Sequence, residues 1–376
     1  MSTKDSIVNV LYNICRIFPI KKNRIVFSSF DNKQYGGNPR VISEYLEQNS
    51  NLELIWVIDK NVKVELPGNV KRVNSHSIKK IYYYATAKVW VDSHHFYNRK
   101  KRKNQYLVQT WHASNPIKKI EGDCLEYFKP SHIRQVRHCS NMTDYQLTDS
   151  DFGREVLKRG MWYSGPILQV GMPINDRLVA SNPDDILETK KKLGLSLTNR
   201  FVLYAPTCRQ HDEDENNTIL DYDRLIANLK EKFGGNWTVL YRGHPISNPN
   251  KDELLKNKYV LDVSQVQQAA DLLLIADIVI TDYSSIIIDF LATSRPGFLF
   301  TYDYADYKGK RDFYFDLHEL PFDMTQNNNE LAEAITEFDV NIYYDKVQRF
   351  KKKINYTETG NATESISRII MMMTED

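Results

Sequence analysis

The stretch Thr281-Asp282-Tyr283-Ser284-Ser285-Ile286-Ile287-Ile288-Asp289-Phe290 decides the fold class, because it follows the apolar run 278–280 and opens a helical pattern. A strand that ends in small hydroxyl residues at a helix start directs backbone N–H groups and a positive dipole end at one point, where a diphosphate can sit. Ser and Asp are also ordinary helix caps, so capping is an alternative interpretation. The stretch predicts an α/β fold with a phosphate site at a strand tip.

Three further segments place polar or basic residues at the end of an apolar strand. They are Gln109-Thr110-Trp111-His112, Tyr204-Ala205-Pro206-Thr207-Cys208-Arg209 and Tyr241-Arg242-Gly243-His244-Pro245. In open parallel α/β sheets, ligands bind beyond the carboxyl ends of the strands. We therefore expect these tips to line one or two clefts.

Apolar strand candidates alternate with helical stretches along the whole chain, which is typical of parallel sheets covered by helices. The candidates are 24–29, 52–58, 88–92, 106–110, 145–148, 167–170, 201–205, 237–242, 259–261, 278–281 and 298–300. They predict two Rossmann-like, doubly wound domains facing across a cleft, at 21–175 and 176–376, after an amphipathic helix at 1–20. The segment 171–175 is expected to carry the crossing between the domains, and the final helices could pack back on the hinge.

Composition excludes several classes of protein. With 376 residues, 41% apolar content and a net charge of +2, the chain is neither disordered nor a dedicated nucleic-acid binder. Its four cysteines have no CxxC spacing and no secretory signal is evident, which favours a reducing, cytoplasmic setting. No apolar stretch reaches the roughly 18 to 20 residues that span a bilayer.

The first helix carries an apolar stripe that ends before the basic run 21–24. Its members are Ile7, Val8, Val10, Leu11, Ile14, Cys15, Ile17 and Phe18. Such a stripe fits a helix lying in a membrane interface, and it fits a helix packed on a domain surface equally well.

Two histidines, His112 and His244, each stand at a strand exit before small residues or a helix breaker. Histidine can remove a hydroxyl proton or, when protonated, support a phosphate oxyanion. A lone histidine is more often structural, so each needs support from its neighbours.

Four strand-tip segments, which begin at Gln109, Tyr204, Tyr241 and Thr281, are followed along the chain by Tyr302-Asp303. In this order they resemble the CDP-glycerol glycerophosphotransferase family of wall teichoic acid primases and polymerases. The resemblance implies a GT-B fold with the acceptor on the N-terminal domain and the donor on the C-terminal one. It also implies transfer of glycerol phosphate or ribitol phosphate from CDP-glycerol or CDP-ribitol to a hydroxyl of a lipid-linked teichoic acid or capsule-polymer acceptor, with release of CMP. The enzyme is then expected as a peripheral protein on the cytoplasmic face of the cell membrane.

On this basis His112 is the expected general base and His244 a second catalytic histidine near the donor phosphates. The expected donor-binding residues are Thr207, Arg209, Arg242, Thr281, Asp282, Ser284, Ser285, Asp289 and Arg311. Asp289 lies one turn after Ser285, so it could accept bonds from ribose hydroxyls or form an ordinary salt bridge. The expected acceptor-binding residues are Gly36, Gly37, Asn38, Trp111 and Ser114, although the glycine pair also fits a plain loop.

No pair of aspartates stands in a metal-binding context, so we expect no obligatory metal or cofactor, with Mg²⁺ carried by substrate phosphates left open. Ala113-Ser114, Cys208 and Ile174 depart from the family pattern, which leaves the acceptor and the choice between primase and polymerase open. Because a fold alone does not set function, two other classes stay open: a nucleotide-sugar glycosyltransferase or epimerase, and a non-catalytic binding protein.

Overall fold

The structure is a computed structural model that describes residues 3–94, 100–112, 115–207, 220–243, 256–310 and 312–376, with the side chains of 3–7 and 310 left out. The chain divides into two compact units. The first unit comprises Met1–Ser114, Ile120–Asp176 and Thr357–Asp376, and the second comprises Asn115–Lys119 and Arg177–Tyr356. No described helix is long and apolar enough to cross a membrane.

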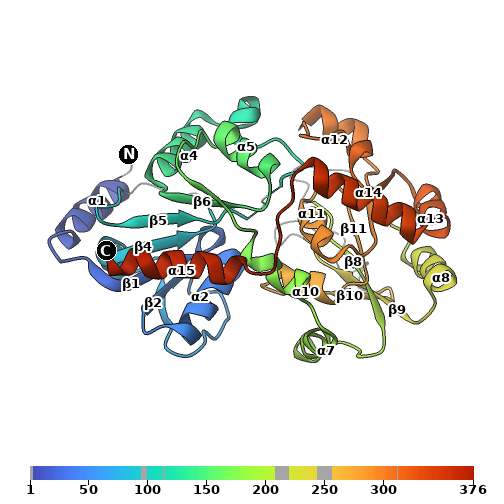
Figure 1. Cartoon of the computed structure of the whole chain (residues 1–376), viewed down its shortest axis with the longest axis horizontal. Helices are drawn as coiled ribbons and strands as arrows, with labels where there is room; N and C mark the ends of the chain where they lie inside the picture. The colour runs from blue at the N-terminus through green and yellow to red at the C-terminus, as the bar shows by residue number, and fades with distance from the viewer. Residues whose placement is uncertain (1–2, 95–99, 113–114, 208–219, 244–255, 311) are drawn as a thin grey trace. The chain divides into compact units, whose positions relative to one another are not determined.

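The first unit is built on a parallel sheet in the order β3-β2-β1-β4-β5-β6-β7 (Figure 1). Its strands are β1 (Lys21–Ser28), β2 (Glu53–Ile58), β3 (Lys71–Asn74), β4 (Ala87–Asp92), β5 (Tyr106–Gln109), β6 (Tyr145–Thr148) and β7 (Ile167–Gln169). Its helices are α1 (Thr3–Cys15), α2 (Gly37–Asn49), α3 (Ile78–Thr86), α4 (Pro130–Met142), α5 (Asp151–Gly160) and α15 (Ala362–Glu375). This strand order turns back between β1 and β4, which is the point where doubly wound sheets bind ligands.

Alternate residues of each strand enter opposite layers of the core. Ile25 and Phe27 of β1 pack with α2 and α15, whereas Val26 packs with α3 and α4 on the other face. Both faces of the sheet are covered, so its central strands read as continuous apolar runs. That is why the sequence predicted them.

The last helix, α15, belongs to the first unit although it comes from the end of the chain. Ile366, Ile370 and Met373 are buried against the face formed by β1, β2 and β4 (Figure 1). At its start, the Asp176 carboxylate accepts the N–H groups of Ala362 and Thr363 at 3.0 and 2.7 Å. The helix therefore completes one apolar layer of the first sheet.

Glu358 lies where the chain returns to the first unit, and it bonds to the segment 171–175, just before the chain leaves that unit. Its carboxylate accepts hydrogen bonds from the backbone N–H of Met172 at 3.0 Å and from Asn175 Nδ2 at 2.9 Å. Burial raises the pKa of this carboxyl well above its ordinary value, and the nearby Asp149 raises it further. Gly171, with φ +90°, passes close enough that a Cβ there would meet the Glu358 carboxylate.

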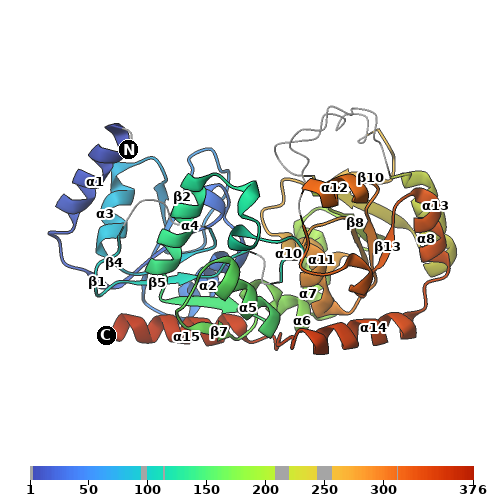
Figure 2. The same cartoon turned by 90° about the horizontal axis from the view of Figure 1, so that it is seen from above.

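The helix α1 packs against α3, and the two lie side by side in Figure 2. Tyr12, which lies outside the predicted stripe, is the buried anchor, and its hydroxyl donates to the Lys100 carbonyl at 3.1 Å. Part of the stripe packs beside it: Val8, Leu11 and Cys15. Its other described members are 51–82% exposed: Val10, Ile14, Ile17 and Phe18. The side chain of Ile7 lies outside the described residues.

The second unit repeats the same parallel order, β10-β9-β8-β11-β12-β13. Its strands are β8 (Arg200–Tyr204), β9 (Trp237–Tyr241), β10 (Val260–Asp262), β11 (Ile278–Thr281), β12 (Gly297–Phe300) and β13 (Asp323–Thr325). Its helices are α6 (Asp176–Val179, starting at the boundary), α7 (Pro183–Lys192), α8 (Tyr222–Phe233), α10 (Ala269–Ile275), α11 (Ile286–Phe290), α12 (Tyr304–Lys310), α13 (Asn328–Thr336) and α14 (Val340–Lys353). Its turning point lies between β8 and β11.

Two strands, β3 and β13, were not predicted from the sequence. Each is a sheet edge of three or four residues with few buried side chains, such as Val73 in β3. An edge strand has only one neighbour, so it needs no continuous apolar run. The pattern that identifies central strands is therefore missing there.

Candidate active site

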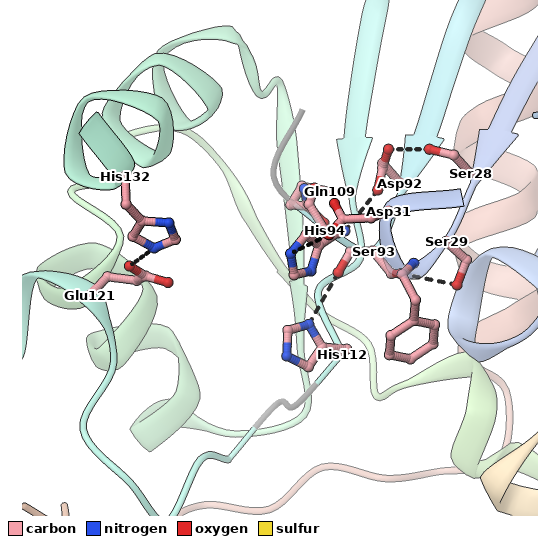
Figure 3. A network of polar contacts seen from close by, with 11 residues as sticks. Ser28, Ser29, Asp31, Asp92, Ser93, His94, Gln109, His112, Glu121 and His132 are labelled. Carbon is pink, nitrogen blue, oxygen red and sulfur yellow. Dashed lines mark hydrogen bonds and ion pairs between the residues drawn. The ribbon is translucent and has the colours of Figure 1, made fainter. Parts of the chain in front are cut away.

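The carboxyl ends of β1, β4 and β5 gather polar side chains at the turning point of the first sheet (Figure 3). The residues that contribute are Ser28, Ser29, Asp31, Asp92, Ser93, His94, Gln109 and His112. Parallel strands in register bring their carboxyl ends to one edge, so residues some 80 positions apart in the chain become neighbours.

His112 is exposed at this edge, and a contact with the backbone helps to orient its ring. Its Nδ1 lies 3.2 Å from the Ser93 carbonyl oxygen. Because a carbonyl only accepts, Nδ1 carries the hydrogen, and Nε2 holds the lone pair of the neutral ring. The ring also contacts Trp111, with centroids 4.1 Å apart. This is the tautomer that a general base acting through Nε2 requires.

Asp92, at the end of β4, is a buried carboxyl that organises the edge. Ser28 Oγ donates to it, and the backbone N–H of His94 donates to it at 2.7 Å. Burial raises the pKa of Asp92 to about 7, against the lowering effect of the Ser28 hydrogen bond. The Asp92 carboxyl therefore titrates near neutral pH, in direct contact with the backbone of His94.

Asp31 is presented by a turn in which three successive residues have left-handed backbones. Phe30, Asp31 and Asn32 have φ values of 45°, 55° and 66°. Left-handed conformations cost roughly 1–2 kcal/mol for each residue other than glycine. The Ser93 hydroxyl helps to hold this turn, because it accepts the Phe30 N–H at 3.3 Å and lies 3.2 Å from Ser29 Oγ. The turn places an Asp31 oxygen 3.5 Å from His94 Nε2.

The residues predicted to bind the acceptor support the edge in different ways. Trp111 is buried with φ 52°, and its N–H donates to Gln109 Oε1 at 2.9 Å. Asn38 is also buried, and its amide donates to the Trp111 carbonyl at 3.3 Å and accepts the Ile174 N–H at 3.0 Å. The Trp111 backbone and the Asn38 side chain therefore both hold the segment that carries His112.

The predicted glycine pair begins a helix. Gly36 is the residue before α2, and its carbonyl accepts the Ser29 hydroxyl at 2.8 Å. Gly37 has φ +67°, and a Cβ there would lie 3.3 Å from the Phe30 ring. The pair supports the strained turn, while contact with an acceptor stays a prediction.

A second histidine–carboxylate pair lies on a separate segment of the first unit (Figure 3). His132 Nε2 lies 2.7 Å from Glu121 Oε2, and Glu121 is buried with φ 43°. The His132 ring stacks on Phe128 with centroids 4.7 Å apart. The pair joins α4 to the turn before it.

At the turning point of the second sheet, the Asp282 carboxylate holds the tip of β8. It accepts the backbone N–H of Thr207 at 2.9 Å and the Thr207 hydroxyl at 2.6 Å. Thr281 is fully buried, and its hydroxyl donates to the Ala205 carbonyl at 2.6 Å. These three predicted donor residues lie together, and two of them lock the strand tip in place.

The helix that follows β11 is short. α11 spans Ile286–Phe290, and Ser285 before it makes no side-chain capping bond. Ser284 Oγ accepts the Ile286 N–H at 3.4 Å, and the Asp289 N–H bonds to the Ser285 carbonyl at 3.3 Å. The side chains of Ser284, Ser285 and Asp289 are half-buried.

The Tyr283 side chain holds the segment between β11 and α11 in place. Its hydroxyl donates to Asp303 at 2.8 Å, and its ring stacks on Tyr307 at 3.9 Å. Arg242 is half-buried and donates to the Val266 carbonyl at 2.9 Å, and desolvation lowers the pKa of its guanidinium. The predicted residues His244, Arg209, Arg311 and Ser114 lie outside the described residues.

Within the described ranges, no group of three His, Cys, Asp or Glu side chains is arranged to hold a metal ion.

The sequence model of the CDP-Glycerol:Poly(glycerophosphate) glycerophosphotransferase family matches residues 10–372 of this chain. The chain belongs to this family. It is an enzyme of the GT-B fold, and its similarity to known members extends over nearly its full length.

Two relatives illustrate the range of the family. A teichoic acid poly(glycerol phosphate) polymerase of Bacillus spizizenii is 28% identical and aligns over 96% of this chain and 95% of its own length. A teichoic acid glycerol-phosphate transferase of Staphylococcus aureus is 30% identical over 93% of both chains. The chain spans about half the length of two other polymerases, from Staphylococcus epidermidis and Bacillus subtilis (51% and 50%).

Among solved structures, the wall teichoic acid polymerase TagF matches with a TM-score of 0.85 and 27% identity, over 98% of this chain and 94% of its own. A TagF variant with CDPG matches with a TM-score of 0.84 and 28% identity over the same shares. The likeness to a UDP-GlcNAc 2-epimerase of Methanocaldococcus jannaschii, with a TM-score of 0.53 and 13% identity, reflects the fold alone.

Sequence reasoning missed the other half of this glycerophosphotransferase edge: Asp31, Asp92, Ser93 and His94. The signal was present, because Asp92-Ser93-His94 follows the apolar strand β4 as His112 follows β5. The same rule about strand tips would have selected them.

Proposed function

We propose that this enzyme transfers glycerol phosphate or ribitol phosphate from CDP-glycerol or CDP-ribitol to a hydroxyl of a lipid-linked teichoic acid or capsule-polymer acceptor. The observation that carries the proposal is the orientation of His112, whose Nδ1–H is held by the Ser93 carbonyl. Membership of the family supports the choice of a CDP-alditol as donor.

The proposed reaction is a single displacement at phosphorus. His112 Nε2 takes the proton of the acceptor hydroxyl while its oxygen bonds to the phosphorus that carries the alditol. The bond from that phosphorus to the bridging oxygen breaks, and CMP leaves with the electron pair. Phosphoryl transfer depends on positioning and charge stabilisation more than on covalent help from the protein.

The donor is proposed to lie at the second turning point, near Ser284 and Ser285. Their hydroxyls can donate hydrogen bonds to a diphosphate, and Asp282 keeps the tip at Thr207 in place beside them. His244, Arg209 and Arg311 stay candidates for donor contacts. If Mg²⁺ takes part, it would arrive on the donor phosphates.

The direct test mixes purified enzyme with CDP-glycerol, or in parallel CDP-ribitol, and a soluble analogue of the lipid-linked acceptor. Acceptor-dependent CMP with one added alditol phosphate identifies a primase, and a ladder of additions identifies a polymerase. UDP-sugar turnover without CMP release from either donor would contradict the proposal and favour the sugar-nucleotide alternative.

We further propose that α1 and the segment after it, up to Phe18, hold the enzyme on the cytoplasmic face of the cell membrane. Ile17 and Phe18 are 82% and 51% exposed, and Lys21 and Lys22 follow them on the surface. Exposed apolar groups beside lysines suit an anionic bilayer surface. Tyr12 fixes the helix on the protein, so the exposed side stays presented.

Replacing Ile17 and Phe18 together by Asp should reduce sedimentation with vesicles that contain anionic lipid. The matched control is Val340→Asp, which changes an equally exposed apolar side chain (63%) of the second unit. Equal sedimentation of all three proteins would refute the membrane proposal without touching the transfer reaction.

A further inference from the structure

A carboxylate–imidazole pair, Asp31 with His94, stands beside the proposed base. The His94 ring lies 5.6 Å from the His112 ring and 6.2 Å from that of Trp111, centroid to centroid. The side chains of His94 and Asp31 are 27% and 37% exposed, so a ligand at the edge can reach them. Figure 3 shows both imidazoles on the same side of the strand ends.

The pair is held in place by buried groups rather than by chance contact. The His94 N–H donates to the buried Asp92 carboxyl at 2.7 Å, and its carbonyl accepts Gln109 Nε2 at 2.6 Å. Asp31 sits in the middle of the left-handed turn that Ser93 supports. Backbone strain concentrates where a protein must hold a functional group in one position.

The chemistry of the pair matches a hydroxyl group. Imidazole and carboxylate together offer a donor and an acceptor, and a hydroxyl can use both. A vicinal diol that makes a hydrogen bond of about 2.8 Å from each hydroxyl is long enough to bridge two imidazoles whose ring centroids lie 5.6 Å apart. A small fragment with one hydroxyl at His112 can therefore place a neighbouring hydroxyl at His94.

We propose that Asp31 and His94 bind the hydroxyl adjacent to the one that attacks, so that the enzyme selects acceptors ending in a vicinal diol. This inference rests on the proposed function, in which His112 is the base for the acceptor hydroxyl. A site built to hydrogen-bond a substrate hydroxyl discriminates against analogues that lack it, because its polar groups lose their partner. Because the pair is partly exposed, we expect about 10- to 100-fold discrimination, less than enclosed sites achieve.

The test compares two soluble acceptors that differ by one oxygen: an acceptor ending in glycerol phosphate, and its analogue ending in 3-hydroxypropyl phosphate. The measured quantity is the ratio of kcat/KM for the two acceptors, from CMP release with the same CDP-alditol. The variants are Asp31→Asn and His94→Phe, the second of which keeps an aromatic ring against Trp111 and His112. Both acceptors are tested on one preparation, so any misfolded fraction cancels from the ratio.

The control pair is Asp59 with His76, whose oxygen and Nε2 lie 3.0 Å apart on the surface of the same unit. We expect wild type and His76→Phe to favour the diol about 10- to 100-fold, and both site variants to approach a ratio of one. Equal rates of wild type on the two acceptors, or a preference that survives in both site variants, would overturn the inference while the proposed function stands. No CMP release by wild type with either acceptor would overturn both.

Discussion

The two sheets share one strand order, yet the edges at their turning points are built from different chemistry. The first edge collects imidazoles and carboxyls from β1, β4 and β5, with His112 exposed among them. The second edge collects hydroxyls and backbone N–H groups around Thr207, Asp282 and Ser284. The first suits proton transfer, and the second suits an anion.

The two edges are also held in place by different groups. At the first edge a buried carboxyl, Asp92, and a left-handed turn hold ionisable side chains in place. At the second edge the Asp282 carboxylate holds the backbone of Thr207, and the proposed donor site beside it consists of short polar groups. Breaking each support should therefore produce a different defect.

The largest effect is expected at the base. His112→Ala should lower acceptor-dependent kcat by about 10²- to 10⁴-fold, the range that general base catalysis contributes. CDP binding, measured by calorimetry, should stay unchanged, because the proposed donor site belongs to the other unit. Wild-type turnover in this variant, with folding verified by circular dichroism, would remove His112 from the mechanism.

The next effect is a pH dependence of stability from Asp92. Its folded pKa of about 7 lies above its ordinary value of 3.8, so the folded state keeps a proton that the unfolded chain has lost between those values. The free energy of unfolding should therefore fall as pH rises from about 4 to about 7. Denaturant unfolding at pH 5 and pH 8 should differ by about 2–3 kcal/mol from this group.

Asp92→Asn removes the titration and should abolish that part of the pH dependence. Asp59→Asn, a change at a surface carboxyl, should retain it. A pH profile that is identical in wild type and Asp92→Asn would show that the carboxyl is ionised throughout.

At the second edge, Asp282→Asn should raise the KM for the CDP-alditol and leave the KM for the acceptor unchanged. One or more charge-assisted bonds to Thr207 are lost, each worth about 1.5–3 kcal/mol, which corresponds to roughly a 10- to 100-fold weaker donor complex. The measurement is initial-rate kinetics with each substrate varied in turn.

Asp277→Asn is the matched control, because Asp277 accepts the Phe201 N–H at 2.8 Å at the opposite end of β11. It should lower stability without changing the KM for the donor. An equal change of donor KM in both variants would mean that Asp282 acts through general stability.

The smallest effect concerns Gly37 beneath the left-handed turn. Gly37→Ala should destabilise the protein by about 1–2 kcal/mol from its positive φ, with a further contribution from contact with the Phe30 ring. Gly194→Ala is the control, because Gly194 has the same φ of +67° and no atom within 4 Å. Equal losses in thermal unfolding experiments would show that the Phe30 turn tolerates the methyl group.

Sequence reasoning recovered the central strands and the tips that carry His112, Thr207 and Asp282, because buried parallel strands read as continuous apolar runs. It missed β3 and β13, whose edge positions require no such run. It did not show that Asn38 and Trp111 are buried and hold the His112 segment, and their contact with the acceptor stays a prediction. Burial depends on partners distant in the chain, and one sequence does not state them.

The sequence by itself determined the α/β class, the order of the strand tips and the resemblance to the glycerophosphotransferases, because these depend on local patterns. Only the tertiary structure decided that Asp31, Asp92 and His94 join His112, and that α15 returns to the first unit. The reason is geometric: parallel pairing in the order β2-β1-β4-β5 brings three distant strand ends to one edge. The tautomer of His112 follows from that pairing, since its partner is a backbone carbonyl that any residue at position 93 would supply.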